Sequence, residues 1–133
     1  MVSAHRLHHE LYSGGKRFTD PGDAKTIRVA KDLQVCEMIT GASGETRTLA
    51  NPTKPGVSFT LRLLTDGGGD AVVTASNGLN VDLKTVATFA DAGDQLEMIS
   101  VTKSAGVYRW EILNNTGSVA LPNIKNQYND NCT

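Results

Sequence analysis

Apolar and polar residues alternate along most of the chain after residue 25, and this period of two is typical of β-strands with one buried face. In segment 57–64, Val, Phe or Leu occupies every second position from Val57, with Ser, Thr and Arg between them. Segment 107–113 repeats the pattern, with Arg109 and Glu111 facing away from its aromatic and aliphatic residues. No stretch of about twelve residues has the spacing of an amphipathic helix. The chain is therefore predicted to be all-β.

Turn residues divide this part of the chain into roughly nine short segments, with the spacing found in sandwiches and barrels. Strong breakers lie at 41–44, at 51–56 (Asn-Pro-Thr-Lys-Pro-Gly) and at 66–70 (Asp-Gly-Gly-Gly-Asp), and Asn77-Gly78 is the favoured dipeptide of a two-residue hairpin turn. The expected strands include 26–30, 35–40, 57–64, 72–74, 86–90, 95–103, 107–113 and 119–121. The pattern predicts an antiparallel β-sandwich of the jelly-roll type.

Residues 1–25 differ from the rest of the chain and are predicted to form an extended N-terminal arm. They carry all three histidines and only scattered apolar residues. Leu7 and Leu11 are spaced one helical turn apart, but no later residue continues that pattern. The predicted organisation is an arm at 1–25, a β-sandwich at 26–121 and a polar C-terminal tail at 122–133.

The overall charge is nearly balanced, with 13 basic and 14 acidic side chains. Such a balance gives no reason to expect nucleic acid or an anionic membrane as a partner. Residues 1–35 hold six basic and four acidic residues, whereas the remainder holds seven and ten. The sequence therefore predicts a slightly basic arm ahead of a slightly acidic body.

The protein is expected to stay in the cytoplasm where it is made, or in a particle assembled there. No apolar run approaches the ~18 residues of a membrane-spanning helix, and the first residues lack the apolar core of a secretory signal. Cys36 lies in an apolar stretch and is interpreted as a buried core residue, while Cys132 lies in the polar tail. A disulfide is not expected in a reducing compartment.

Only one cluster has metal-ligand residue types, and it consists of His5, His8, His9 and Glu10. On a helix, His5 would share a face with His8 or His9, as ligand pairs do. The zinc-protease pattern, however, needs a glutamate directly after the first histidine of an i, i+4 pair on a long helix. The arm lacks that arrangement, so a polar arm is the preferred interpretation and no cofactor is predicted.

Four aspartates lie in glycine-containing segments, namely Asp66, Asp70, Asp91 and Asp94. Such segments indicate either calcium-binding loops or tight turns. A calcium loop alternates oxygen ligands and closes with a glutamate, which neither segment does, whereas Asp and Gly are ordinary turn residues. The glycine run 67–69 lacks the Lys-Ser/Thr and the helix of a phosphate loop. All three histidines lie in the arm, so the predicted sandwich contains none that could activate a nucleophile. No pair of carboxylates stands out as the acid and base of a hydrolase. The sequence predicts a protein that is not an enzyme.

Several turn segments resemble those of small structural proteins of tailed bacteriophages. They are Arg-Thr-Leu-Ala-Asn-Pro-Thr-Lys-Pro-Gly at 47–56, the segment 61–70, Thr-Phe-Ala-Asp-Ala-Gly-Asp at 88–94, Arg109-Trp110, and Gly-Ser-Val-Ala-Leu at 117–121. The resemblance spans about residues 46–121 and includes neither the arm nor the tail. It implies a capsid-associated β-domain of the decoration, or cement, type.

This resemblance implies a virion protein that is made in the host bacterial cytoplasm and binds the major capsid protein on the outer surface of the phage head. Decoration proteins are typically homotrimers that clamp neighbouring capsomers with an N-terminal arm. Ordering such an arm costs conformational entropy that the shell contact must offset. The expected capsid contacts are the apolar and basic arm residues Arg6, Leu7, Leu11, Tyr12, Lys16, Arg17 and Phe18. Apolar residues on both faces of some strands, such as Val72 and Val73, also favour self-association.

Two other classes of function remain open from the sequence. A trimeric tail-fibre or receptor-binding tip is also a β-sandwich, but it usually continues from a longer shaft. A carbohydrate-binding or adhesion module normally shows exposed aromatic platforms, and this chain has one tryptophan, Trp110. Binding to a glycan array would separate both classes from a decoration protein.

Overall fold

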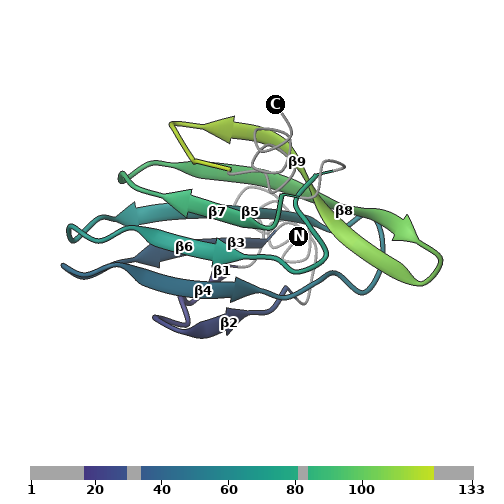
Figure 1. The fold of residues 1–133 in the computed structure, drawn as a ribbon, viewed down its shortest axis with the longest axis horizontal. Coiled ribbons are helices and arrows are strands. Elements are labelled where there is room, and N and C mark those ends of the chain that lie inside the picture. The colour runs from purple at the N-terminus through teal and green to yellow at the C-terminus, as the bar shows by residue number, and fades with distance from the viewer. Residues whose placement is uncertain (1–16, 30–33, 81–83, 122–133) are drawn as a thin grey trace, which may run out of the picture.

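The structure, a computed structural model, describes residues 17–29, 34–80 and 84–121. These residues form two β-sheets packed face to face, without a helix (Figure 1). The strands are β1 (Arg17–Phe18), β2 (Lys25–Ile27), β3 (Gln34–Ile39), β4 (Glu45–Leu49), β5 (Ser58–Thr65), β6 (Ala71–Thr74), β7 (Val86–Phe89), β8 (Gln95–Ser104) and β9 (Val107–Thr116). The predicted all-β sandwich is confirmed.

Both sheets are mixed, so the prediction of an antiparallel jelly roll was wrong. Sheet A has the strand order β1-β3-β5-β8-β9, and sheet B has the order β2-β4-β6-β7. Strands β1, β3 and β5 are parallel, as are β2, β4 and β6, whereas the pairs β5–β8, β8–β9 and β6–β7 are antiparallel. Side chains alternate between faces in both kinds of sheet. The sequence pattern therefore could not distinguish the two directions.

The parallel pairs arise because the chain changes sheet at every connection from β1 to β6. Odd-numbered strands of this part lie in sheet A and even-numbered strands in sheet B. The chain thus makes three turns of a coil, each adding one strand to each sheet. We call residues 17–74 the coil region. The antiparallel strands that follow, within residues 84–121, form the hairpin region.

The connections lie at two opposite ends of the sandwich (Figure 1). The turn end, at the left of the figure, consists of segments 19–24, 40–44, 66–70 and 90–94. The loop end consists of the described parts of the other connections, which are 28–29, 50–57, 75–80 with 84–85, and 105–106. The glycine-rich turn 66–70 and the proline-containing loop 51–56 therefore lie at opposite ends of the sandwich.

The core lies between the sheets and is lined by every second residue of the longer strands. Trp110 is 1% exposed, with its ring centroid 5.9 Å from that of Phe59, and its Nε1–H donates to the carbonyl oxygen of Ala50 at 3.0 Å. Cys36 is fully buried, which confirms its predicted place in the core. Burial raises the pKa of the Cys36 thiol to about 12, and the Asp20 carboxylate contributes to the same direction. Cys36 therefore stays a thiol at neutral pH and acts as a packing residue.

Strand structure begins earlier than the sequence predicted. Strand β1 pairs with β3 and β2 starts at Lys25, so residues 17–25 of the predicted arm belong to the sandwich. Strand β4 was also missed, because the inward position between Glu45 and Leu49 holds Arg47 rather than an apolar residue. These strands are short or charged, and both properties weaken the period-two signal.

The Asn77-Gly78 dipeptide does not form the predicted two-residue hairpin. The connection from β6 to β7 is longer, because β7 starts only at Val86. The Gly78 N–H donates to the carbonyl oxygen of Ala75 at 3.0 Å, and the Leu79 N–H donates to that of Lys84 at 2.6 Å. The dipeptide therefore ends a turn of residues 75–78 inside a longer loop.

Two of the four sheet edges are covered by other parts of the chain. The N–H groups of Trp110 and Ile112 on β9 donate to the carbonyl oxygens of Gly78 and Leu79, both at 3.3 Å. On β7, Thr88 exchanges two backbone hydrogen bonds with Ala120, at 2.9 and 3.0 Å. The segment 119–121, which was predicted to be a strand, forms this single antiparallel bridge in the structure. The backbone groups bonded in this way are not free to pair with another chain.

Candidate functional site

A buried guanidinium group, that of Arg47, points from β4 into the core at the turn end. It is 1% exposed. Its Nε and Nη2 groups donate to the two carboxylate oxygens of Asp20, both at 2.7 Å. Nη2 also lies 3.0 Å from Oε1 of Glu45 and donates to the carbonyl oxygen of Ile39 at 3.1 Å. A planar guanidinium suits this bidentate contact.

Asp20 joins three elements through the same carboxylate. Besides Arg47 on β4, it accepts hydrogen bonds from the N–H groups of Ile39 on β3, at 2.9 Å, and Gly22 in its own turn, at 3.2 Å. Burial by itself would raise the pKa of Asp20, but these hydrogen bonds and the positive charge of Arg47 outweigh it and lower the pKa. Burial likewise would lower the pKa of Arg47, and the carboxylates of Asp20 and Glu45 raise it instead. Both groups are therefore charged at neutral pH.

The turns of the coil region stack directly on one another through glycine. A Cβ added to Gly69 would lie 2.0 Å from the carbonyl oxygen of Ser43, and one added to Gly67 would lie 2.3 Å from that of Thr40. The Gly69 N–H donates to the carbonyl oxygen of Gly41 at 2.9 Å. Only glycine permits so close an approach of two backbones.

Asp94 holds the corresponding turn of the hairpin region. It is 3% exposed, and its Oδ2 accepts hydrogen bonds from the N–H groups of Ala90 and Asp91, at 3.1 and 3.2 Å. Its Oδ1 accepts one from Ser118 at 3.0 Å. Asp66 caps its own turn through a 2.8 Å bond from the Gly68 N–H. For Asp66 and Asp94, the predicted role in tight turns is confirmed.

The arrangement at the turn end therefore orders backbone and joins elements. Among the residues that the structure describes, no group of three or more His, Cys, Asp or Glu side chains is placed to hold a metal ion. The cluster of His5, His8, His9 and Glu10 lies outside those residues. Sequence reasoning missed the ion pair of Asp20 and Arg47, although an arginine at an inward position of a strand pattern is a usable signal.

Two of the predicted capsid contacts, Arg17 and Phe18, form strand β1 and pair with Val35 and Cys36 of β3. The structure thus brings these two residues together on one edge of sheet A. The other predicted contacts lie outside the described residues. They are Arg6, Leu7, Leu11, Tyr12 and Lys16.

The outer faces of the two sheets differ in chemistry. Sheet A carries ion pairs, with Arg62 Nη1 3.8 Å from Oε2 of Glu37 and Arg109 Nη1 2.7 Å from Oε1 of Glu111. The outward strand residues of sheet B are uncharged, and they are Thr26, Thr46, Thr48, Val72, Thr74, Val86 and Thr88. Val72 and Val73 were the apolar neighbours that favoured self-association in the sequence. In the structure, Val73 is buried in the core and Val72 is half-buried on the outer face of sheet B.

No family model matches the sequence, and no curated protein matches it. In the described part of the chain, no helix has the length and apolar character needed to cross a membrane.

Proposed function

We propose that the protein is a structural component of a tailed-phage virion that binds the major capsid protein on the outer surface of the head and stabilises the shell. The proposal starts from the resemblance of residues 46–121 to small phage structural proteins. In the structure, the segments that carry this resemblance hold the sandwich together. They supply Arg47, the stacked glycines Gly67 and Gly69, the cap Asp94 and the core residue Trp110.

The observation that carries the proposal is the direct connection between the predicted arm and the rigid body. Strand β1 lies within the predicted arm and is also the edge strand of sheet A. Immediately after it, Asp20 is bound by Arg47 and by the Ile39 N–H. A clamp needs such a fixed attachment, because force on a loosely joined arm would not reach the body.

In this function, the arm anchors the body to the shell and the body stays outside. Leu7, Leu11 and Tyr12 supply apolar contact in grooves of the capsid, while Arg6 and Lys16 meet acidic surface. On the shell the protein is a homotrimer, as decoration proteins typically are. A three-fold cluster of density in a map of the decorated head tests this assembly.

The test is co-sedimentation with undecorated, expanded capsids of the protein's own virus. Residues 17–25 are left intact, because their deletion would remove β1 and leave Arg47 buried without Asp20. The full chain is compared with two arm variants, Leu7→Ala/Leu11→Ala/Tyr12→Ala and Arg6→Ala/Lys16→Ala. Each is expected to weaken binding by about tenfold or more, which corresponds to about 1.4 kcal/mol.

A matched control changes exposed residues of the body, with Thr48→Ala/Thr74→Ala on sheet B. It is expected to bind like the unchanged protein. Equal binding by the arm variants would show that the arm is not the anchor. Binding to host cells or to a glycan array, with none to capsids, would replace the proposal by a receptor-binding or carbohydrate-binding function.

A further inference from the structure

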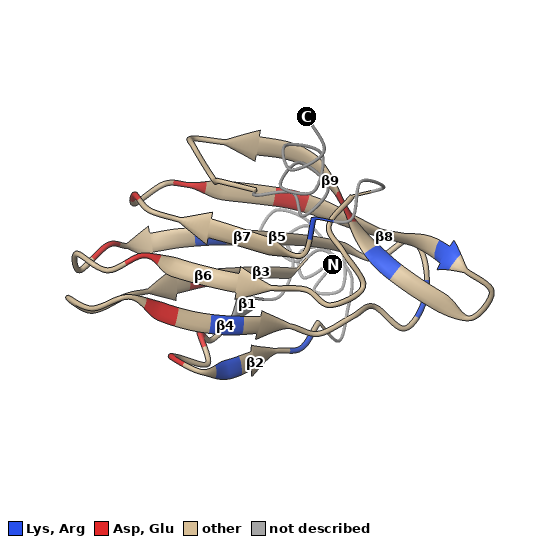
Figure 2. Cartoon of the chain, in the orientation of Figure 1, with Lys and Arg blue, Asp and Glu red and all other residues tan. Residues whose placement is uncertain are grey.

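Many of the described charged residues lie at or near the two ends of the sandwich, and the others lie on the strands of sheet A (Figure 2). Among the described residues, the acidic side chains in or beside the turn end are Asp20, Asp23, Glu45, Asp66, Asp70, Asp91 and Asp94. The basic side chains there are Lys25, Arg47 and Arg62, the last of which pairs across sheet A with Gln95, next to Asp94. At the loop end, the described connections contain Arg28, Lys54 and Lys84, and Lys103 lies on the adjoining part of β8. The one acidic residue beside these described connections is Glu111, which is paired with Arg109 at 2.7 Å.

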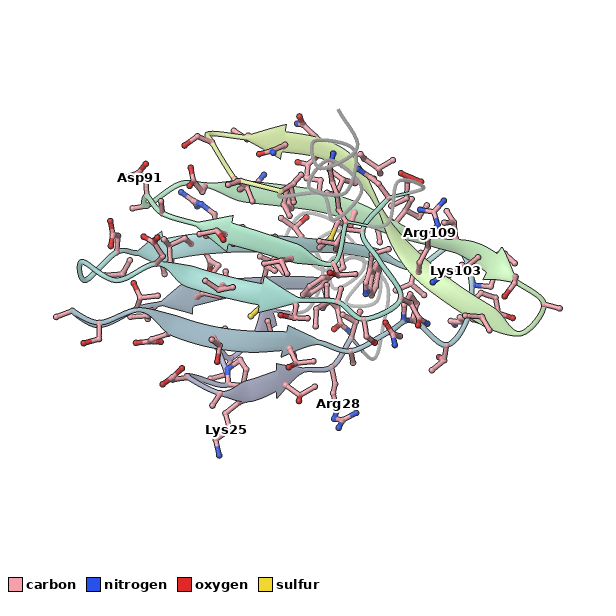
Figure 3. All side chains as sticks on the ribbon, in the orientation of Figure 1. Lys25, Arg28, Asp91, Lys103 and Arg109 are labelled. Atoms are coloured by element: carbon pink, nitrogen blue, oxygen red, sulfur yellow. The ribbon has the colours of Figure 1, made fainter. Side chains whose placement is uncertain are left out.

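Burial decides which of these charges can act on a partner. At the turn end, Asp20 and Glu45 are paired with Arg47, and Asp94 is buried. The exposed acidic residues that remain are Asp23, Asp66, Asp70 and Asp91. The basic residues beside them are Lys25, which is exposed, and Arg62, which is half-buried and lies 3.8 Å from Glu37. At the loop end, the exposed residues are Arg28, Lys54 and Lys103, and Lys84 is half-buried. Figure 3 shows Asp91 and Lys103 at opposite ends of the sandwich.

The two patches are too far apart to neutralise each other within one molecule. Strand β5, with eight residues, runs from the loop end to the turn end, and at about 3.3 Å per residue it spans roughly 26 Å. The Debye length is about 8 Å at physiological ionic strength. Each patch is therefore available to an oppositely charged surface outside the molecule.

We propose that the turn end of one copy binds the loop end of a second copy. Both complementary surfaces are present on the same chain, so no other partner is needed to match them. Contact between two turn ends, or between two loop ends, would bring like charges together, which selects the head-to-tail orientation. Such a contact is heterologous, and patches at opposite ends of the long axis produce an open chain of copies.

This association is weak and depends on salt, because exposed ion pairs contribute little in water. It concerns contacts between copies in the absence of any shell, so it does not depend on the proposed function. Sedimentation velocity of the full chain over a range of concentrations is the measurement. Growth in mean mass is expected at about 0.01 M ionic strength, where the Debye length is about 30 Å, and is lost at about 1 M, where it is about 3 Å.

Charge reversal at each end tests the contact itself. The turn-end variant is Asp70→Lys/Asp91→Lys, whose side chains accept no hydrogen bond from a described residue, and the loop-end variant is Arg28→Glu/Lys54→Glu/Lys103→Glu. Each variant alone is expected to lose the growth. An equimolar mixture is expected to regain it, because each reversed end then meets an oppositely charged end.

The matched controls place the same kinds of charge away from the ends, with Thr48→Lys/Thr74→Lys and Thr48→Glu/Thr74→Glu. Melting temperatures of all variants check that they are folded. Controls that behave like the unchanged protein, together with recovery in the mixture, support the proposal. It is overturned if the unchanged protein shows no growth at low salt, if growth persists at high salt, or if the mixture does not recover.

Discussion

The coil region and the hairpin region share one core but end their sheets in different ways. In the hairpin region, the edge of β9 is covered by residues 78–79 and the edge of β7 by Ala120. In the coil region, the sheets end in β1 and β2, which have two and three residues. Short edge strands limit pairing with other chains, but they also have few backbone hydrogen bonds to hold them.

The two regions also depend on different contacts. Turns of the coil region stack backbone on backbone at Gly67 and Gly69, and its first turn is fixed by Asp20 and Arg47. The hairpin region relies on the buried ring of Trp110 and the carboxylate of Asp94. We therefore expect local opening to begin at β1 and β2, where the fewest contacts must break.

The largest expected effect comes from the residue that joins both regions. Trp110→Ala removes the contact with Phe59 on β5 and the hydrogen bond to Ala50, so we expect a loss of about 4 kcal/mol in the free energy of unfolding. The control Tyr108→Ala, at a half-buried position of the same strand, is expected to cost about 1 kcal/mol. Urea denaturation measures both. Equal costs would show that Trp110 does not link the regions.

The stacking of turns in the coil region is tested by adding one methyl group. Gly69→Ala would place Cβ 2.0 Å from the Ser43 carbonyl oxygen, so the turns must separate, and we expect a cost of about 3 kcal/mol. In the neighbouring turn, a Cβ at Gly44 would come no closer than 4.0 Å, to the Asp70 carbonyl oxygen. Gly44→Ala is expected to change stability by less than about 0.5 kcal/mol. Thermal denaturation of the pair decides whether close stacking contributes to stability.

The ion pair of Asp20 and Arg47 at the first turn is expected to stabilise mainly the strands next to it. Asp20→Ala leaves Arg47 buried with only Glu45 as a carboxylate partner, and we expect a cost of about 2 kcal/mol. Hydrogen exchange should accelerate in residues 17–27 while β8 and β9 stay protected. Asp23→Ala, which loses one exposed hydrogen bond to Thr46, should cost about 0.5 kcal/mol. Uniform acceleration across both regions would contradict the proposed order of opening.

Acid should weaken the same turn. The pKa of Asp20 is lower in the folded protein than its ordinary value, so its contribution is present above the unfolded pKa and is lost as pH falls through the folded pKa. We expect the free energy of unfolding to decrease below about pH 4, the ordinary range of an aspartate. Asp20→Asn should show a smaller decrease between pH 7 and pH 3 in urea denaturation. The same slope in both proteins would assign the acid sensitivity to other carboxylates.

The smallest effect is expected from removal of divalent metal ions. Carboxylate oxygens of Asp66 and Asp94 already accept backbone hydrogen bonds in the two regions. The melting temperature should therefore be the same with and without a chelator. A decrease of more than a few degrees on chelation would show that these turns bind a cation.

Local sequence patterns were sufficient to find the strands with clear alternation and the turns between them. Segments 57–64, 95–103 and 107–113 correspond to β5, β8 and β9. The burial of Cys36 also followed from its apolar neighbours. These properties depend on residues close in the chain, because alternation reports only which face of a strand is buried. The predicted capsid contacts in the arm stay predictions, since most lie outside the described residues.

Which strands pair, and in which direction, was decided only by the tertiary structure. Strand β3 pairs with β5, although β4, which lies between them in the sequence, belongs to the other sheet. No local pattern encodes that choice of partner. The position of Arg47 in the strand pattern could suggest that it is buried, but its main partner, Asp20, lies 27 positions away in the sequence and is brought to it only by the fold. The cover of β9 likewise depends on a loop that precedes it by some thirty residues. Local periodicity determines burial, whereas pairing depends on contacts between distant segments, which form only when the core is assembled.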